Sequence, residues 1–343
     1  MRIAVDAMGG DFAPEQVLQG ASDAAAEYGI DISIVGLPGV VQPLLNRHPT
    51  LTLVPCTQVI GMDEHPAQAV RAKPDSSMSV CARLCKEGRA DGWISAGNSG
   101  AIMATALFIQ GRIRGVERPA LGSVIPTRTG LAYFLDVGAN VDSKPEYMVQ
   151  FAAMGAVYAR EMMGRTEPTI GLLSNGEEEG KGDERVRETT KRLKGTMKGF
   201  IGNVEPKDLY AAKADVIVAD GFVGNVALKA SEGIVAMLYE FLKAEFTRNL
   251  LTRLAAGIAY PVLRAVKHRI DPRRHNGATL VGLKGVVVKS HGSADVLAFK
   301  HALRKAHTEA AHGVLDNIAQ RMAAISALTL PSATTPEASV SDV

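Results

Sequence analysis

Four short turns carry the residues of this sequence that could bind an anion. They read Ala96-Gly97-Asn98-Ser99-Gly100, Asp136-Val137-Gly138-Ala139-Asn140, Asn175-Gly176-Glu177 and Asp220-Gly221-Phe222-Val223-Gly224-Asn225. Each turn follows a short apolar run and leads into a helix-like segment. Glycine lets backbone N–H groups approach an anion closely, and helix N-termini add free donors and partial positive charge. The turns together predict a phosphate-type site, although any one of them could be an ordinary strand-to-helix connection.

Several cationic side chains lie close to these turns in the sequence: Lys73, Lys181, Lys229, Lys289, His65 and His291. Lys181 stands among acids in "NGEEEGKG", where it could be held in place or could open a solvated helix. His291 in "KSHGSAD" follows an apolar run, so it should point toward the same sheet edge, together with Ser293. A surface lysine or a structural histidine remains the alternative at each position.

Motifs for other chemistries are absent from the sequence. It has no G-x-x-x-x-G-K-[ST] loop and no G-x-G-x-x-G after the first apolar run, so nucleotide binding is weakly supported. It has no G-x-S-x-G nucleophile turn either. With no clear cluster of acids and histidines, we expect neither a metal nor a cofactor.

The elements that must position these turns alternate in type along the chain. Apolar runs at 2–6, 30–35, 51–55 and 91–95 alternate with helix-like segments at 14–27, 40–47 and 76–88. Strand, turn and helix follow one another again from 131, 169, 215 and 285. This order predicts a single Rossmann-like α/β/α domain over residues 1–328, with a mostly parallel sheet and helices on both faces. The carboxyl ends of parallel strands share one edge, and ligands bind there.

Composition limits the class of protein further. A formal net charge of +2 over 343 residues gives no basic field of the kind that nucleic-acid binders show. The three cysteines, Cys56, Cys81 and Cys85, are odd in number and indicate structural thiols in a reducing cytoplasm. The acid at Asp6 leads us to expect no signal sequence, and the absence of a run of 18 uncharged apolar residues leads us to expect no membrane span. The small, polar stretch 329–343 predicts a disordered tail.

The segment 244–275 fits no strand–helix–strand unit. Residues 244–274 hold seven Arg or Lys side chains against two acids. Leu251, Leu254 and Ile258 recur at helical spacing, Pro261 interrupts, and Val262 to Ile270 repeat the spacing. We expect a basic amphipathic helical hairpin that lies on a membrane surface, contacts a second subunit, or packs as ordinary core.

With these motifs in view, the chain resembles the bacterial acyl-ACP:phosphate acyltransferases (the PlsX family). The resemblance runs from "IAVDAMGGDFAP" at residues 3–14 to about residue 315. It includes "KPDSSM" (73–78), "SAGNSGA" (95–101), "FLDVGAN" (134–140), "LLSNGEEEGKG" (172–182), "DGFVGNVALK" (220–229) and "KSHGSAD" (289–295). It implies a homodimeric enzyme with a fold like those of phosphotransacetylases and isopropylmalate-type dehydrogenases.

The resemblance also implies an activity and partners. A long-chain acyl group would pass from acyl carrier protein (ACP) to inorganic phosphate, giving acyl phosphate for phospholipid synthesis. A membrane glycerol-3-phosphate acyltransferase would use that product. The enzyme would then be cytoplasmic and peripherally attached to the inner face of the cell membrane.

Site residues are carried over by motif. The residues expected to act in catalysis are Lys181, Asn225, Lys229 and His291. Those expected to bind phosphate or the acyl donor are Asp6, Gly9, Asn98, Ser99, Gly100, Asp136, Gly138, Asn140, Glu177, Asp220, Gly224 and Ser293. An acyl-CoA phosphotransacetylase, a metal- and nicotinamide-dependent dehydrogenase and a non-catalytic lipid-surface scaffold are the competing interpretations.

Overall fold

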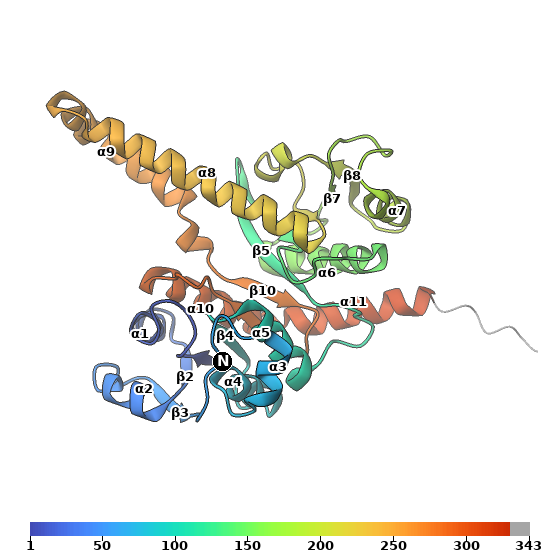
Figure 1. Cartoon of the computed structure of the whole chain (residues 1–343). Coiled ribbons are helices and arrows are strands. Elements are labelled where there is room, and N and C mark those ends of the chain that lie inside the picture. Colours follow the sequence, from blue (N-terminus) through green and yellow to red (C-terminus); the bar gives the residue numbers. More distant parts are fainter. Residues whose placement is uncertain (330–343) are drawn as a thin grey trace, which may run out of the picture.

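One eleven-stranded sheet runs through the computed structural model, which describes residues 1–329, with side chains up to residue 324. The predicted tail therefore lies outside the described residues beyond Thr329. The strand order is β3-β2-β1-β4-β11-β10-β5-β6-β9-β7-β8. Two blocks of parallel strands flank a mixed centre (Figure 1).

The first block contains β1 (Arg2–Asp6), β2 (Asp31–Gly36), β3 (Thr52–Pro55), β4 (Gly92–Ser95) and β11 (Val286–Lys289). Its connecting helices are α1 (Glu15–Tyr28), α2 (Pro38–Leu45), α3 (Pro66–Ala72), α4 (Ser77–Lys86) and α5 (Ser99–Thr105), the last continued by a π-helical turn η1 (Ala106–Gln110). This alternation confirms the predicted order of strands and helices.

The second block contains β6 (Gly130–Leu135), β9 (Val216–Val218), β7 (Ile170–Leu173) and β8 (Phe200–Val204). Its helical elements are α6 (Pro145–Met163), α7 (Glu184–Leu193), η2 (Pro206–Tyr210) and α8 (Gly221–Thr247). Asp183 caps α7 through the N–H of Val186, and α6 begins at Pro145 without a side-chain cap. Ser143, just before α6, is buried and donates to the Asn140 carbonyl.

Two central strands join the blocks and reverse the direction of the sheet. Strand β10 (Ala278–Val281) is antiparallel to both β11 and β5 (Ala120–Thr127), and β5 is antiparallel to β6. The second block therefore runs opposite to the first. The prediction that all four turns share one sheet edge is wrong, because it assumed parallel strands throughout.

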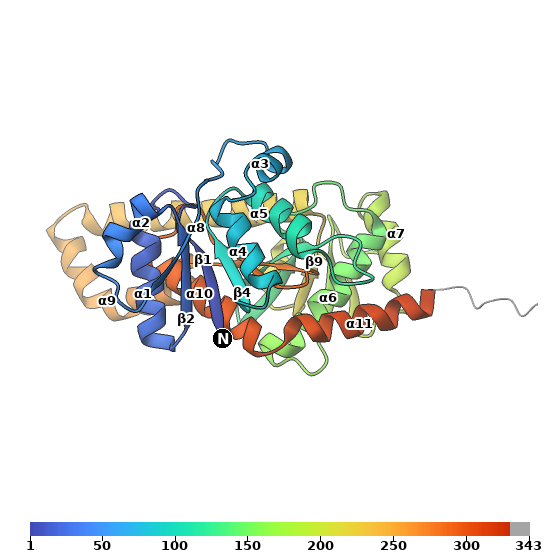
Figure 2. The same cartoon turned by 90° about the horizontal axis from the view of Figure 1, so that it is seen from below.

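Helices cover both faces of the sheet, as predicted (Figure 2). On one face, α1 and α10 (Val296–Ala311) pack on the first block, and α6, α7 and α11 (Val314–Thr329) pack on the second. On the other face, α4, α5 and the start of α8 share one apolar cluster that spans both blocks. Helices of both blocks therefore pack into one apolar cluster above the sheet centre on this face.

Helices α8 and α9 (Leu250–Ile270) project from the body as a pair, which we call the arm (residues 230–270; Figure 1). Pro261 was expected to divide two short helices, but α9 continues through it and its partner is the longer α8. Proline costs a helix one backbone hydrogen bond. Here the carbonyl that loses its donor belongs to exposed Gly257, so water can replace the bond. The 3-10 turn η3 (Pro272–His275) returns the chain to β10.

Candidate functional site

A small cavity of ≈ 80 Å³ lies above the sheet centre, between the two blocks. Small residues from two of the glycine-rich turns form part of its wall, and apolar side chains form the rest. Its lining consists of Ser99, Gly100, Ile102, Met103, Leu121, Gly138, Ala139, Leu280 and Lys289. Lys289 is the single charged residue in this lining.

Strand register explains how turns from opposed blocks meet here. Lys289 is level with Ser95 on one side and Ala278 on the other. At the next level, Thr279 pairs with Gly122, and Gly122 pairs with Leu135. Strands β4, β11 and β6 thus end at nearly the same level although β6 runs the other way, and the turns that follow β4 and β6 both border the cavity.

The turn after β4 forms the first wall, and its Asn98 side chain has an internal role. The Asn98 carbonyl oxygen accepts from the N–H of Ala101, and Nδ2 donates to the carbonyls of Met62 and Glu64. Asn98 was expected to bind the anion directly, but its amide is fully used to cap α5 and hold the neighbouring loop. The N–H groups of Ser99 and Gly100 have no partner among residues 1–329.

Asp6 and Gly9 support this wall from the end of β1. Ser95 Oγ donates to Asp6 Oδ2 at 2.6 Å and accepts from the N–H of Gly97 at 3.0 Å. A Cβ on Gly9 would come within 2.7 Å of the Gly97 nitrogen, so only glycine fits. Burial raises the pKa of the Asp6 carboxyl. Both residues were expected to bind substrate, and in the structure both fix the turn.

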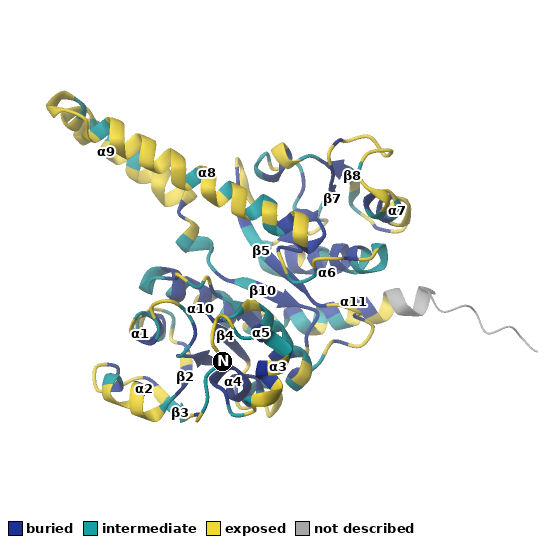
Figure 3. Ribbon diagram, in the orientation of Figure 1, coloured by how far each residue is buried: buried dark blue, intermediate teal, exposed yellow. Residues whose placement is uncertain are grey.

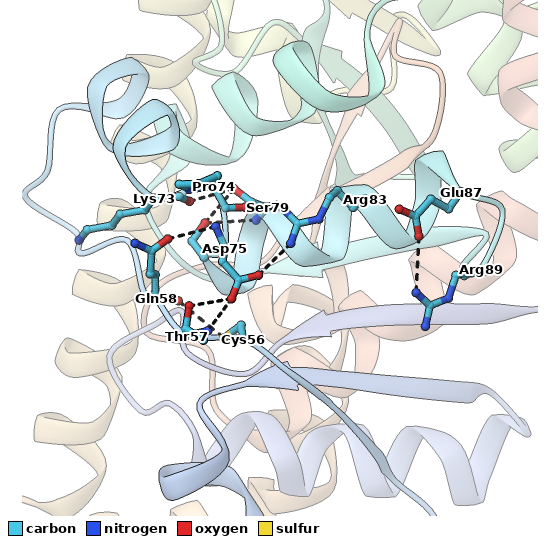
Figure 4. A network of polar contacts seen from close by, with 11 residues as sticks. Cys56, Thr57, Gln58, Lys73, Pro74, Asp75, Ser79, Arg83, Glu87 and Arg89 are labelled. Carbon is cyan, nitrogen blue, oxygen red and sulfur yellow. Dashed lines mark hydrogen bonds and ion pairs between the residues drawn. The ribbon is translucent and has the colours of Figure 1, made fainter.

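The "KPDSSM" segment holds the start of α4 in the same way (Figure 4). Lys73 Nζ donates to Glu64 Oε1 at 2.6 Å and to the Val59 carbonyl at 2.8 Å. Asp75 accepts from Thr57 and forms an ion pair with Arg83. The ammonium of Lys73 is thus committed to the loop, and His65 begins α3 as an exposed residue.

The turn after β6 forms the second wall around a buried carboxylate. Asp136 accepts from the N–H groups of Leu121, Gly138, Ala139 and Asn140. Asn140 Nδ2 donates to Asp136 and to the Pro119 carbonyl. Asp136 and Asn140 therefore shape the turn, and Gly138 lines the cavity with an N–H that is already bonded.

The first turns of α8 pack against the turn after β6. Asp220 caps the helix through the N–H groups of Phe222 and Val223. A Cβ on Gly224 would lie 1.8 Å from the Asp136 carbonyl oxygen, so glycine allows α8 to dock here. Asn225 contacts Gly138, at 3.5 Å from an ideal Cβ there, and its amide makes no hydrogen bond within the described chain. Asn225 is the free amide of the site.

The end of β11 contributes Lys289 to the cavity lining, and His291 lies in the turn that follows. His291 Nδ1 accepts from the N–H of Ser293 at 3.2 Å and lies 2.9 Å from Ser293 Oγ. The neutral ring therefore carries its proton on Nε2. Burial, followed by the positive charges of Lys289 and Lys229, lowers the pKa of His291. Lys229 is exposed on α8, one turn beyond Asn225, and its charge acts on His291.

The turn after β7 lies elsewhere. Strand β7 is separated from β6 by β9. Lys181 is exposed, with its methylenes against Gly176, and it does not line the cavity. Glu177 groups with Glu205 and Asp208 in an arrangement that could hold a cation. Lys213 Nζ already lies 2.9 Å from Glu177 and 3.3 Å from Asp208, so a lysine supplies the positive charge.

The cavity brings together a free cation, free backbone donors and apolar walls. Sequence reasoning named Lys289 among cationic candidates but did not select it, and it missed the four apolar residues of the lining. The sequence signal for Lys289 was its position at the end of the apolar run 285–289. The apolar residues carried no signal that separates them from core.

The fold is an α/β fold of the phosphotransacetylase type. A phosphotransacetylase from Streptococcus pyogenes superposes with a TM-score of 0.62 at 18% identity, covering 91% of this chain and 94% of the other. The EutD phosphotransacetylase from Staphylococcus aureus superposes at 0.54 and 17% identity, covering 93% and 94%. At this identity the likeness concerns the fold.

Sequence comparison identifies the family. The model of a family described as fatty acid synthesis protein matches residues 1–317. A phosphate acyltransferase from Alkalilimnicola ehrlichii is 47% identical over 93% of this chain and 95% of its own length. One from Geobacillus thermodenitrificans is 45% identical over 93% and 98%. The chain belongs to this family of phosphate acyltransferases.

Proposed function

We propose that the protein transfers a long-chain fatty acyl group from acyl carrier protein to inorganic phosphate in the central cavity. The observation that carries the proposal is the composition of the cavity, in which one cation and free N–H groups adjoin four apolar side chains. Such a lining suits a small anion next to an aliphatic chain. The family membership and the relatives' name, phosphate acyltransferase, support the transfer to phosphate.

The reaction needs proximity more than a protein nucleophile. A phosphate oxygen attacks the thioester carbonyl, the carbon–sulfur bond breaks, and the proton of hydrogen phosphate passes to the leaving thiolate. A thiol has a pKa of about 8.5, so its thiolate leaves without a strong general acid. The protein must hold phosphate beside the carbonyl and stabilise the tetrahedral oxyanion. The Asn225 amide and the Nε2–H of His291 are donors for those two tasks.

Phosphate-dependent release of carrier thiol from palmitoyl-ACP tests the proposal. We expect thiol release, followed with a chromogenic thiol reagent, to require phosphate and to give acyl phosphate in equal amount. Absence of release would contradict the enzyme function and favour a non-catalytic scaffold. The donor comparison belongs in the same assay: acetyl-CoA as the better donor would favour a soluble phosphotransacetylase instead.

We also propose that the arm attaches the enzyme peripherally to the inner face of the cell membrane, from the cytoplasm. The arm residues are almost entirely exposed (Figure 3). Ile258 is 85% and Leu251 77% exposed, and none of α9 is buried. Among the described helices, α8 is long and apolar enough to cross a membrane by length and composition. Its start is fixed in the site by buried Gly221 and Gly224, which favours lateral attachment over crossing.

Basic side chains strengthen the case for a lipid surface. Arg253, Arg264 and Lys267 lie on the exposed α9, and Lys267 also lies over the Tyr239 ring of α8, 5.4 Å from its centre. Each basic residue near anionic lipid contributes roughly 1 kcal/mol. Acyl phosphate is itself amphiphilic, so release at the bilayer would deliver it to a membrane glycerol-3-phosphate acyltransferase for phospholipid synthesis.

Flotation with anionic liposomes tests the membrane role. We expect the wild type to float and a Leu254→Glu/Ile258→Glu variant to remain at the bottom of the gradient. Val40→Glu, at an exposed position of α2 on the body, is the control and should float. If the double variant floats like the wild type, the membrane role of the arm is excluded. A change from homodimer to monomer in the same variant, measured by light scattering, would assign the apolar face to the subunit contact.

A further inference from the structure

Lys289 is the one lysine of the described chain that lines the central cavity. It is the last residue of β11 and lines the central cavity among small and apolar residues. Its backbone is held from both sides, because β11 pairs with β4 and with β10 at this level. The strand ladder therefore fixes where the ammonium group can reach.

The ammonium of Lys289 has no hydrogen-bond or ion-pair partner among residues 1–329. Other lysines with limited exposure do have one: Lys73 bonds to Glu64, Lys300 to Glu27, and Lys305 to the Gly277 carbonyl. Removing a cation from water is unfavourable unless an anion or hydrogen-bond acceptor compensates for the lost hydration. An anion bound in the cavity would compensate the Lys289 ammonium for the hydration that burial removes.

The charges around Lys289 also favour a bound anion. Burial and the neighbouring Lys229 lower its pKa, and Glu232, exposed on α8, opposes them weakly. His291 lies in the turn after β11, where burial and the charges of Lys289 and Lys229 lower its pKa. Around Lys289 itself, two lysines against the one exposed acid leave a net positive charge.

We propose that Lys289 binds the phosphate nucleophile directly and is the main cation of the site, in place of Lys181. The proposal rests on the proposed function and names the residue that holds its second substrate. Lys289 keeps its proton throughout, because hydrogen phosphate supplies the proton that reaches the leaving thiolate. The ammonium thus positions phosphate and offsets its charge, while bond making and breaking occur between phosphate and the thioester.

Phosphate kinetics of Lys289 variants test this assignment. We expect Lys289→Met to raise the KM for phosphate at least tenfold and to leave the KM for palmitoyl-ACP within twofold. Lys289→Arg keeps the charge and should recover part of the loss. Lys284→Met, in the exposed turn before β11, is the matched control and should behave as wild type.

Direct binding separates this proposal from the proposed function. Inorganic phosphate titrated onto the wild type and followed by ³¹P NMR should show saturable broadening that Lys289→Met abolishes. An active wild type with an unchanged phosphate KM in Lys289→Met overturns the role of Lys289 and leaves the function standing. An inactive wild type that binds phosphate only when Lys289 is present overturns the function and leaves the site standing. Should Lys289→Met fail to fold, judged by circular dichroism, Lys289→Gln takes its place in both measurements.

Discussion

At the residue scale, most of the predicted site residues are framework. Asp6, Asn98, Asp136 and Asn140 direct their side-chain oxygens and nitrogens at the protein's own backbone. A turn that must present a few free N–H groups to a ligand has to satisfy all its other polar groups internally. Among the side-chain groups without a partner in the described chain are the Asn225 amide and the Lys289 ammonium.

Replacing Asn225 should therefore lower kcat/KM for phosphate more than replacing Lys181. Replacing Asn225 by Ala removes the free amide beside Gly138, and we expect kcat/KM for phosphate to fall about tenfold or more, since a hydrogen bond to a charged group contributes about 1.5–3 kcal/mol. Lys181→Ala removes an exposed side chain outside the cavity lining and should leave kcat/KM within about twofold. Initial rates of thiol release at varied phosphate measure both. Equal losses would place Lys181 back in the site.

Two of the turns that the sequence indicated border the cavity, but the sequence could not assign the roles of their residues. Gly, Asn and Asp are needed both to build a tight turn and to bind an anion, so the motifs alone cannot separate the two uses. Lys289 was the reverse case. A single lysine at the end of an apolar run resembles a surface charge until the opposed strands are placed beside it.

At the element scale, α8 links the site to the arm. Its first turns carry Asn225 and Lys229, and the same continuous helix carries exposed Met237 and Phe241 further along. The helix docks through Gly221 and Gly224 on the turn after β6. The position of the whole arm therefore depends on two glycines.

Gly224→Ala tests this docking. A Cβ there would overlap the Asp136 carbonyl, so the helix start must shift, and we expect a loss of about 1–3 kcal/mol of folding stability, as in overpacked cores. The displaced Asn225 should also reduce kcat. Thermal unfolding and thiol release measure the two effects.

Gly233→Ala provides the matched control on the same helix. An added Cβ at Gly233 meets nothing within 4 Å. We expect a gain of about 0.5–1 kcal/mol, because glycine is the poorer helix former, with kcat unchanged. If both alanine variants behave alike, close approach at Gly224 is not what docks α8.

At the scale of the whole molecule, the strand–helix alternation gave the fold class but not the sheet direction. β5 and β10 were not anticipated, because β10 has four residues and follows the arm, and β5 lies in a segment without a helix before its hairpin partner β6. These two strands reverse the second block. Long-range pairing of this kind leaves no periodic signal in the sequence, so the position of the cavity above the sheet centre required the structure.

Acid stability is a property of the whole fold to which one buried histidine should contribute measurably. His301 on α10 is buried, neither ring nitrogen has a hydrogen-bond partner in the described chain, and burial, then Arg304 and Arg274, lower its pKa to about 4. Since the unfolded value is near 6.5, the unfolded state binds the proton first. His301 therefore lowers folding stability as the pH falls from about 6.5 to 4, by up to about 3 kcal/mol.

Buried Asp6, Asp136 and Glu309 have raised pKa values and act in the opposite direction, so the test is a difference between two proteins. His301→Leu removes the titrating ring while filling the same space. Urea unfolding at several pH values should show that the variant and wild type diverge below pH 6.5, with the variant more stable at pH 4.5. His268→Gln, on the exposed α9, should follow the wild-type profile. Parallel profiles for wild type and His301→Leu would mean that His301 finds a proton acceptor on folding and that its burial does not destabilise the charged ring.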